Sequence, residues 1–122
     1  APARSVTGAH ITDPSPRLAD LLQGRVGGLA ESLRIAKFGA DRGIGIWSGG
    51  MDETGIGRAV NIQLQTAEGF SLPGDTSETS RYFHEDIADP PVVLDPDGFI
   101  AIPPGPGIGV RIDPDRLRKS TI

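Results

Sequence analysis

The stretch GIWSGGMDETGIGRAVN, residues 45–61, joins a short apolar run to a glycine-rich loop and then to a helical pattern. The apolar run contains Ile46 and Trp47, and the sequence Ser48-Gly49-Gly50 ends it. A run of this length that stops at small, turn-forming residues is typical of a buried strand in a mostly parallel sheet. The loop that follows carries the acidic pair Asp52-Glu53. Whether such a loop binds a ligand or only turns a corner is the question that the rest of the chain has to answer.

Helical patterns precede and follow this strand. The apolar positions of the preceding pattern are Leu29, Leu33, Ala36 and Ala40, with Gly43 where a C-terminal cap belongs. The apolar positions of the following pattern are Ile56, Ala59, Val60, Leu64 and Ala67, with Gly69 closing it. The order helix, strand, glycine loop, helix predicts an α/β unit, in which ligands usually bind at the carboxyl ends of strands.

The remaining segments are less regular. Residues 1–28 have no sustained period, and we expect irregular structure or a weak helix at the apolar piece formed by Leu18, Leu21 and Leu22. Residues 72–91 are polar, acidic and rich in turn formers, which predicts a long surface loop.

Near the C-terminus, the apolar runs 92–94 and 99–102 flank Asp95-Pro96-Asp97-Gly98, a pattern that predicts a hairpin. The segment GPGIGVRID, residues 105–113, is a candidate edge strand, and Asp113-Pro114 is expected to cap a last short helix.

Composition limits the class of protein. The chain has 122 residues, enough for one compact domain, and 17 glycines with 11 prolines indicate many loops. The formal charge of −4, with basic residues scattered among acids, argues against a nucleic-acid or anionic-membrane partner and favours a small molecule or a protein. The absence of cysteine excludes a disulfide framework and fits a cytoplasmic protein. We expect neither a signal peptide nor a membrane span, because every apolar stretch is short or broken by Pro and Gly.

The glycine loop does not match the known phosphate-binding motifs. Gly50 and Gly55 have the Walker spacing, but Ile56-Gly57 stands where Lys-Ser/Thr is required. The acidic pair would also repel a polyphosphate unless a metal or Arg58 offset its charge. From the local sequence alone, a strand-to-helix corner that needs glycine conformations is favoured over an anion site.

Other candidate groups have ordinary structural interpretations. The acids around His84 lack the ordered spacing of a calcium loop and favour a solvated acidic loop over a Mg²⁺ site. These acids are Asp75, Glu78, Glu85, Asp86 and Asp89. His10 is a lone histidine, Arg25 either pairs with a carboxylate or covers a helix start, and Tyr82-Phe83 is expected to anchor the long loop, with contact to a ligand as the alternative.

Several motifs in one order carry a resemblance to a known family. They are GRVGGL at residues 24–29, GGM-x-ETGIGRA at 49–59, LPGD-x-S at 72–77, RYF-x-EDI at 81–87 and GPGIGV at 105–110. Together they resemble the C-terminal part of the o-succinylbenzoate synthases and N-acylamino acid racemases, which are mandelate racemase/muconate lactonizing-like members of the enolase superfamily. The resemblance implies an α/β fold, the last strands and helices of a modified TIM barrel, with a tail that contributes to an α+β capping domain.

The resemblance also implies a chemistry. In that family a divalent metal, usually Mg²⁺, and two lysines support proton abstraction beside a carboxylate, which leads to a dehydration of the menaquinone-pathway type or to racemisation. By the same resemblance, the substrate-binding positions of this chain are Gly49, Gly50, Met51, Asp52 and Tyr82. The loop is then expected to meet a carboxylate or acyl group of a small-molecule substrate.

The catalytic positions of the family are not matched. Aligning on Gly24-Arg25 places Leu22 where the family has its second lysine, and leucine cannot transfer a proton. The nearest counterpart of the third metal ligand is Ala3-Arg4-Ser5, which lacks a carboxylate. We therefore expect no catalytic residue and no metal ligand in this chain, and no activity from it alone.

The resemblance divides the chain into three segments: a diverged, irregular segment at 1–23, a partial barrel at 24–70, and a loop, hairpin and capping-domain tail at 71–122. Two alternatives stay open. The chain could be a stand-alone, non-catalytic domain that binds a partner chain or a small carboxylate through the loop Gly49–Gly57. It could also self-associate or join a separate chain that supplies the missing barrel strands.

Overall fold

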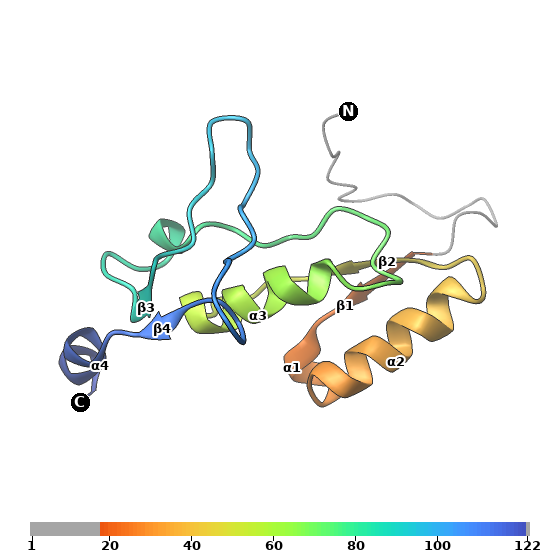
Figure 1. Ribbon diagram of the computed structural model, residues 1–122. Coiled ribbons are helices and arrows are strands. Elements are labelled where there is room, and N and C mark those ends of the chain that lie inside the picture. Colours follow the sequence, from red (N-terminus) through yellow and green to blue (C-terminus); the bar gives the residue numbers. More distant parts are fainter. Residues whose placement is uncertain (1–17, 122) are drawn as a thin grey trace. The chain divides into compact units, whose positions relative to one another are not determined.

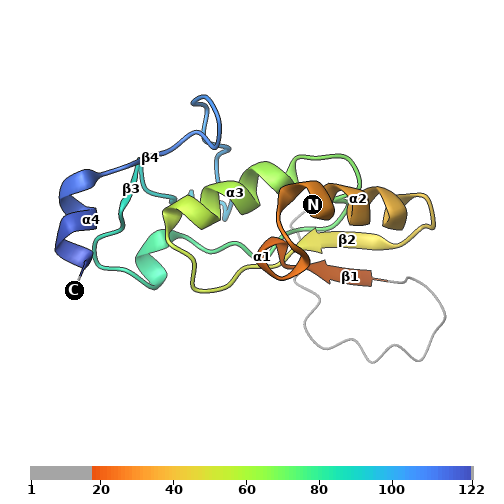
Figure 2. The same cartoon turned by 90° about the horizontal axis from the view of Figure 1, so that it is seen from below.

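The structure is a computed structural model that describes residues 18–121. The described residues form two compact units. Figures 1 and 2 show their helices and strands. The first unit contains residues 18–49 and 64–75, and the second contains residues 50–63 and 76–121. The expectations for His10 and for Ala3-Arg4-Ser5 lie outside the described residues.

The first unit is a two-stranded parallel sheet with helices. Its elements are β1 (Leu18–Leu21), α1 (Gln23–Val26), α2 (Leu29–Ala40) and β2 (Gly45–Ser48). The strands pair in register from Leu18 opposite Gly45 to Leu21 opposite Ser48. Helix α2 lies beside this pair in both views (Figures 1 and 2). The predicted helix, the predicted strand and its parallel pairing are therefore confirmed.

An apolar cluster holds the first unit together. Its buried members are Leu21 from β1, Ala36 from α2, Ile46 from β2 and Leu64. Burying apolar side chains from several elements in one cluster is the main stabilising contribution in a unit of this size. The cluster therefore fixes the strand ends from which the candidate site begins.

Residues 18–22 correct an expectation. We predicted irregular structure or a weak helix, but Leu18–Leu21 is the strand β1. The strand has only four residues, and a strand inside a parallel sheet need not alternate apolar and polar residues. Its pairing with β2, a contact distant in sequence, decides its conformation.

The second unit contains one long helix and several short elements. They are α3 (Gly55–Gln65, whose last two residues belong to the first unit), the 3₁₀ helix η1 (Thr79–Arg81), β3 (Ala88–Asp89), β4 (Arg111–Ile112) and α4 (Pro114–Ser120). Strands β3 and β4 pair antiparallel, with Ala88 opposite Ile112. The predicted edge strand is thus present, reduced to two residues.

The predicted hairpin is present as a turn with little regular pairing. Leu94 and Ile100 form a single antiparallel bridge, and the Asp95 N–H donates to the Phe99 carbonyl at 2.8 Å. Gly98 has φ +85°, the left-handed conformation that the turn needs and that glycine adopts without strain. The two flanking runs are extended loops and not the strands that the sequence pattern predicted.

The last helix begins as predicted. Asp113 is the N-cap of α4, and its side chain accepts hydrogen bonds from the backbone N–H groups of Asp115 and Arg116. Pro114 occupies the first turn, where its missing N–H costs nothing. Among the described residues, no helix is long and apolar enough to cross a membrane.

Candidate functional site

The carboxyl ends of β1 and β2 lie at the same edge of the parallel sheet in the first unit. Gly49 follows β2 directly, is buried, and donates its N–H to the Leu21 carbonyl at 3.1 Å. A Cβ at Gly49 would collide with the Asp20 carboxylate and lie 2.8 Å from Leu22 Cδ2. Gly49 therefore lets the Asp20 and Leu22 side chains pack closely on the strand ends, and it does not have a positive φ. The expected reason for glycine, an unusual backbone conformation, is wrong at this position.

Two carboxylates approach each other at this edge. Burial is the main cause that raises the pKa of Asp20, the negative charge of Asp75 adds to the effect, and a backbone hydrogen bond from Gly49 acts in the opposite direction. The Asp75 N–H donates to the Ser48 carbonyl at 3.0 Å, which places Asp75 beside the end of β2. Asp20 therefore holds a proton more readily than an isolated aspartate does.

The described residues do not fit a magnesium site. Mg²⁺ needs several oxygen ligands in near-octahedral geometry. Within residues 18–121, no three His, Cys, Asp or Glu side chains gather closely enough to hold a metal ion. Leu22, at the position where the resemblance expects a lysine, is the residue before helix α1 and offers no group that transfers a proton.

The glycine loop at the start of the second unit is tied to helix α3 by Glu53. One oxygen of the Glu53 carboxylate accepts the Met51 backbone N–H at 2.7 Å, and the other accepts Asn61 Nδ2 at 3.3 Å. A Cβ at Gly57 would lie 2.8 Å from Glu53 Cβ, so glycine at 57 gives Glu53 its space. The Met51 amide is already paired, whereas Met51 as a residue is 54% exposed. A ligand would therefore meet the side chain or carbonyl of Met51 rather than its N–H.

The N-terminus of α3 is capped by a carboxylate of the protein itself. The Gly55 N–H donates to Asp86 Oδ2 at 2.7 Å, and Asp86 is 5% exposed. A negative charge at this end of a helix is favourable because unpaired N–H groups point outward there. The prediction that Asp86 belongs to a solvated acidic loop is wrong, and the anion that the helix end receives is Asp86.

Arg58 and Tyr82 form the other notable contact of the second unit. Arg58 is 1% exposed, and its guanidinium carbon lies 4.7 Å from the centroid of the Tyr82 ring. Arg58 Nη1 also donates to the Ser77 carbonyl at 3.1 Å and to Ser77 Oγ at 2.8 Å. Sequence reasoning considered Arg58 only as a charge that could offset Asp52 and Glu53. The available signal was the spacing of Gly55, Arg58 and Asn61, which places three non-apolar residues on one face of α3.

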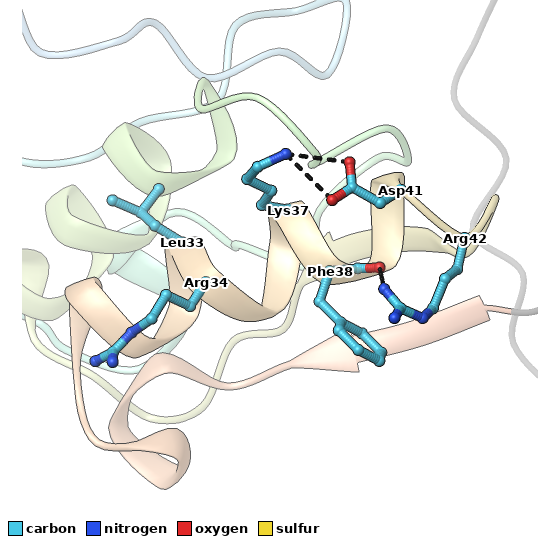
Figure 3. A pocket seen from close by; sticks show the side chains of 6 residues that line it. All are labelled: Leu33, Arg34, Lys37, Phe38, Asp41 and Arg42. Carbon is cyan, nitrogen blue, oxygen red and sulfur yellow. Dashed lines mark hydrogen bonds and ion pairs between the residues drawn. The ribbon is translucent and has the colours of Figure 1, made fainter.

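Surface hollows also lie on residues away from these contacts, and two of them are lined by described residues alone. One, of about 450 Å³, lies on α2 and the turn after it, and its lining residues are Leu33, Arg34, Lys37, Phe38, Asp41 and Arg42 (Figure 3). Its charges are already engaged: Lys37 pairs with Asp41 at 3.1 Å, and the Arg42 guanidinium lies 3.5 Å from the Phe38 ring centroid. The other, of about 230 Å³, is lined by Pro90–Val93, Ala101–Pro104 and Val110.

The five predicted substrate-binding residues are divided between the units. Gly49 belongs to the first unit, whereas Gly50, Met51, Asp52 and Tyr82 belong to the second. Met51, Asp52 and Tyr82 are exposed. Neither hollow contains any of the five. Their assignment to a substrate site stays a prediction.

Comparison with known proteins places these features in a family. The family model "Enolase C-terminal domain-like" matches residues 18–116, which is most of the chain. The chain belongs to the enolase superfamily. The α/β class and the resemblance to the C-terminal part of these proteins are thereby confirmed, and the chain corresponds to a portion of a TIM-barrel protein.

Curated relatives include o-succinylbenzoate synthases and N-succinylamino acid racemases. The o-succinylbenzoate synthase of Geobacillus kaustophilus is 45% identical over 107 residues, which are 88% of this chain and 28% of that protein. The N-succinylamino acid racemase of Thermus thermophilus is 44% identical over 123 residues, which are 97% of this chain and 33% of that protein. The chain therefore spans about a third or less of the length of these two relatives.

Solved structures agree with the assignment. An enolase superfamily member from Enterococcus faecalis V583 matches with a TM-score of 0.79 and 45% identity over 84% of this chain and 28% of that chain. An enolase from Pseudomonas fluorescens with bound magnesium, potassium and tartrate matches with a TM-score of 0.67 and 26% identity, over 84% of this chain and 24% of that chain. The two units thus have counterparts in complete members of the superfamily.

Proposed function

We propose that this sequence is the C-terminal part of an enzyme of the o-succinylbenzoate synthase or N-succinylamino acid racemase type. The observation that carries the proposal is the match over 88% of the chain to proteins with the first name, at 45% identity, together with a similar match to proteins with the second. The same comparison aligns this chain with only about 28% of those relatives. The complete enzyme then has most of its residues outside the described segment.

In this proposal the chain supplies substrate-side contacts and not the reacting groups. The loop Gly49–Asp52 and the ring of Tyr82 line the substrate, and the exposed Met51 and Tyr82 side chains offer apolar surface to a succinyl or acyl arm. The acid, the base and the ligands of Mg²⁺ come from residues outside the described segment. The partner of the complete site is a small-molecule carboxylate.

The 122-residue chain alone is expected to be inactive. Leu22 cannot transfer a proton, and the described residues gather no metal-binding cluster. The assignment of residues 24–70 to the barrel and 71–122 to a capping-domain tail is part of this proposal.

A graft tests the proposal. Residues 24–121 replace the matching segment of the Geobacillus kaustophilus relative, whose own upstream residues are kept. We expect the graft to form o-succinylbenzoate. Tyr82→Ala in the graft should raise KM about tenfold with a smaller effect on kcat, since a contact made equally in the ground and transition states affects binding alone.

The matched control is Phe99→Ala, because Phe99 is 62% exposed in the hairpin turn and has no proposed contact with substrate. A folded graft without turnover, or equal effects of Tyr82→Ala and Phe99→Ala on KM, would contradict the proposal.

A further inference from the structure

Arg58 is the largest fully buried side chain among the described residues. Only one of its three side-chain nitrogens has hydrogen-bond partners: Nη1 binds both oxygens of Ser77, whereas Nε and Nη2 have none within residues 18–121. Its remaining contact of note is the face of the Tyr82 ring.

The stability of the unit does not explain an arginine at this position. Removing a guanidinium from water is costly, and the cost is offset only when the charge is well paired and fully hydrogen-bonded. No salt bridge within the described residues includes Arg58. An apolar side chain of similar length, such as methionine, would fill the same space without leaving Nε and Nη2 unpaired. The specific contribution of arginine is therefore geometric: a planar group that stacks on a ring while it donates to a fixed carbonyl.

Arg58 lies on a face of α3 whose other residues also bind segments outside the helix. Gly55, Arg58 and Asn61 are three residues apart, so they lie on one face of the helix. Each holds a different segment of the second unit: Gly55 binds Asp86, Arg58 binds the segment from Ser77 to Tyr82, and Asn61 binds Glu53 of the glycine loop. The loop and the Tyr82 segment are thus anchored to the same helix face, one turn apart.

We propose that Arg58 is a positioning residue that acts through Tyr82. The guanidinium fixes one face of the ring, and the 45% of Tyr82 that remains exposed is thereby presented to the acyl arm of the substrate in a single orientation. This inference rests on the proposed function for its substrate, but the ordering of the ring by Arg58 is a property of the unit itself.

The ring is observed directly by ¹⁹F NMR, because Tyr82 is the only tyrosine of the chain and 3-fluorotyrosine gives a single reporter. Arg58→Met should move the ¹⁹F signal toward that of free fluorotyrosine and narrow the line. Arg58→Lys should have a smaller effect, because lysine keeps the positive charge but lacks the planar guanidinium. Arg34→Met is the matched control, since Arg34 is an exposed arginine of α2. An unchanged Tyr82 signal in Arg58→Met would overturn the inference.

A double-mutant cycle in the graft separates positioning from general destabilisation. Arg58→Met should raise KM by several-fold with little change in kcat, and in the Tyr82→Ala background it should have no further effect, because the group through which it acts is gone. If the factors by which Arg58→Met and Tyr82→Ala raise KM simply multiplied in the double variant, the inference would be overturned. If the graft is inactive, the proposed function fails, whereas the ¹⁹F signal still decides the role of Arg58. If Arg58→Met fails to fold, the same cycle is run with Arg58→Lys and judged by the same criterion.

Discussion

The two units are stabilised in different ways. In the first unit the buried cluster is apolar and joins both strands to α2 through Leu21, Ala36 and Ile46. The second unit also buries apolar side chains such as Ile62 and Val92, but it additionally buries Arg58, Asn61 and Asp86, which hold loops by hydrogen bonds. Apolar packing is non-directional, whereas hydrogen bonds fix the orientation of each group. Apolar packing in the first unit thus holds its strands and α2 together. Buried hydrogen bonds in the second unit fix the conformation of its exposed loops.

The largest expected effect is loss of the apolar cluster. Ile46→Ala should destabilise the first unit by about 2–5 kcal/mol, because it leaves a cavity among well-packed neighbours. Unfolding in urea, followed by the fluorescence of Trp47, the only tryptophan, measures it. Ile112→Ala is the control, since Ile112 is 51% exposed. Equal effects of the two changes would mean that the cluster is not the stabilising element.

The next largest loss of stability is expected from a substitution that adds a side chain at Gly55, at the N-terminus of α3. A Cβ at Gly55 would lie 2.5 Å from Ala88 Cβ and collide with the Asp86 carboxylate, so we expect Gly55→Ala to destabilise the second unit by about 1–3 kcal/mol. Hydrogen exchange of the amides of α3 and β3 measures the change. Gly24→Ala is the matched control, because nothing lies within 4 Å of a Cβ there. If Gly55→Ala leaves exchange unchanged, the close packing of Asp86 against α3 is not present in solution.

The stability of the first unit should depend on pH because of Asp20. The pKa of Asp20 is raised, so the folded state binds the proton more tightly than the unfolded state does, and stability falls as pH rises through the folded pKa. Asp20→Asn should therefore raise the melting temperature at pH 7 and leave it unchanged near pH 3, where both states are protonated. Asp75→Asn, which removes only the weaker cause, should give a smaller gain. A gain that does not vary with pH would contradict this explanation.

The smallest effect is expected at the last helix. The backbone N–H of Arg116 is the main cause that lowers the pKa of Asp113, and the N–H of Asp115 and the nearby positive charges add to it. The cap is therefore present at neutral pH and is lost as pH falls below the ordinary aspartate value and through the folded pKa. Circular dichroism should show a small loss of helix in Asp113→Ala at pH 7, and in the unaltered chain only in acid. Asp97→Ala is the control. If Asp113→Ala lost as much helix relative to the unaltered chain in acid as it does at pH 7, the cap would be excluded as the cause.

The longer helices and the strand β2 were largely predictable from sequence. The strand at 45–48 and the helices at 29–40 and 55–65 were found because apolar residues recur with a clear period and small residues end each run. Leu18–Leu21 was missed because four residues carry no period, and its pairing with β2 is a contact distant in sequence. Local patterns do not contain that information.

The anchoring of the second unit was not predictable in the same way. Asp86 looked like one of several loop acids, and only the fold brings it to Gly55, 31 residues away in sequence. The glycines of the loop were expected to serve backbone conformation, whereas Gly49, Gly55 and Gly57 serve close approach. A periodicity analysis that counts only apolar residues also overlooks Gly55, Arg58 and Asn61, because these three residues are not apolar and bind loop segments through hydrogen bonds.

The central claim is that this chain contributes substrate contacts to an enzyme whose reacting groups lie elsewhere. The most direct test assays the purified 122-residue chain and the graft side by side for Mg²⁺-dependent formation of o-succinylbenzoate and for racemisation of an N-succinylamino acid. We predict no turnover by the chain and turnover by the graft, with at least one of the two substrates. Measurable turnover by the chain alone would contradict the claim, because it would require an acid and a base within the sequence described here.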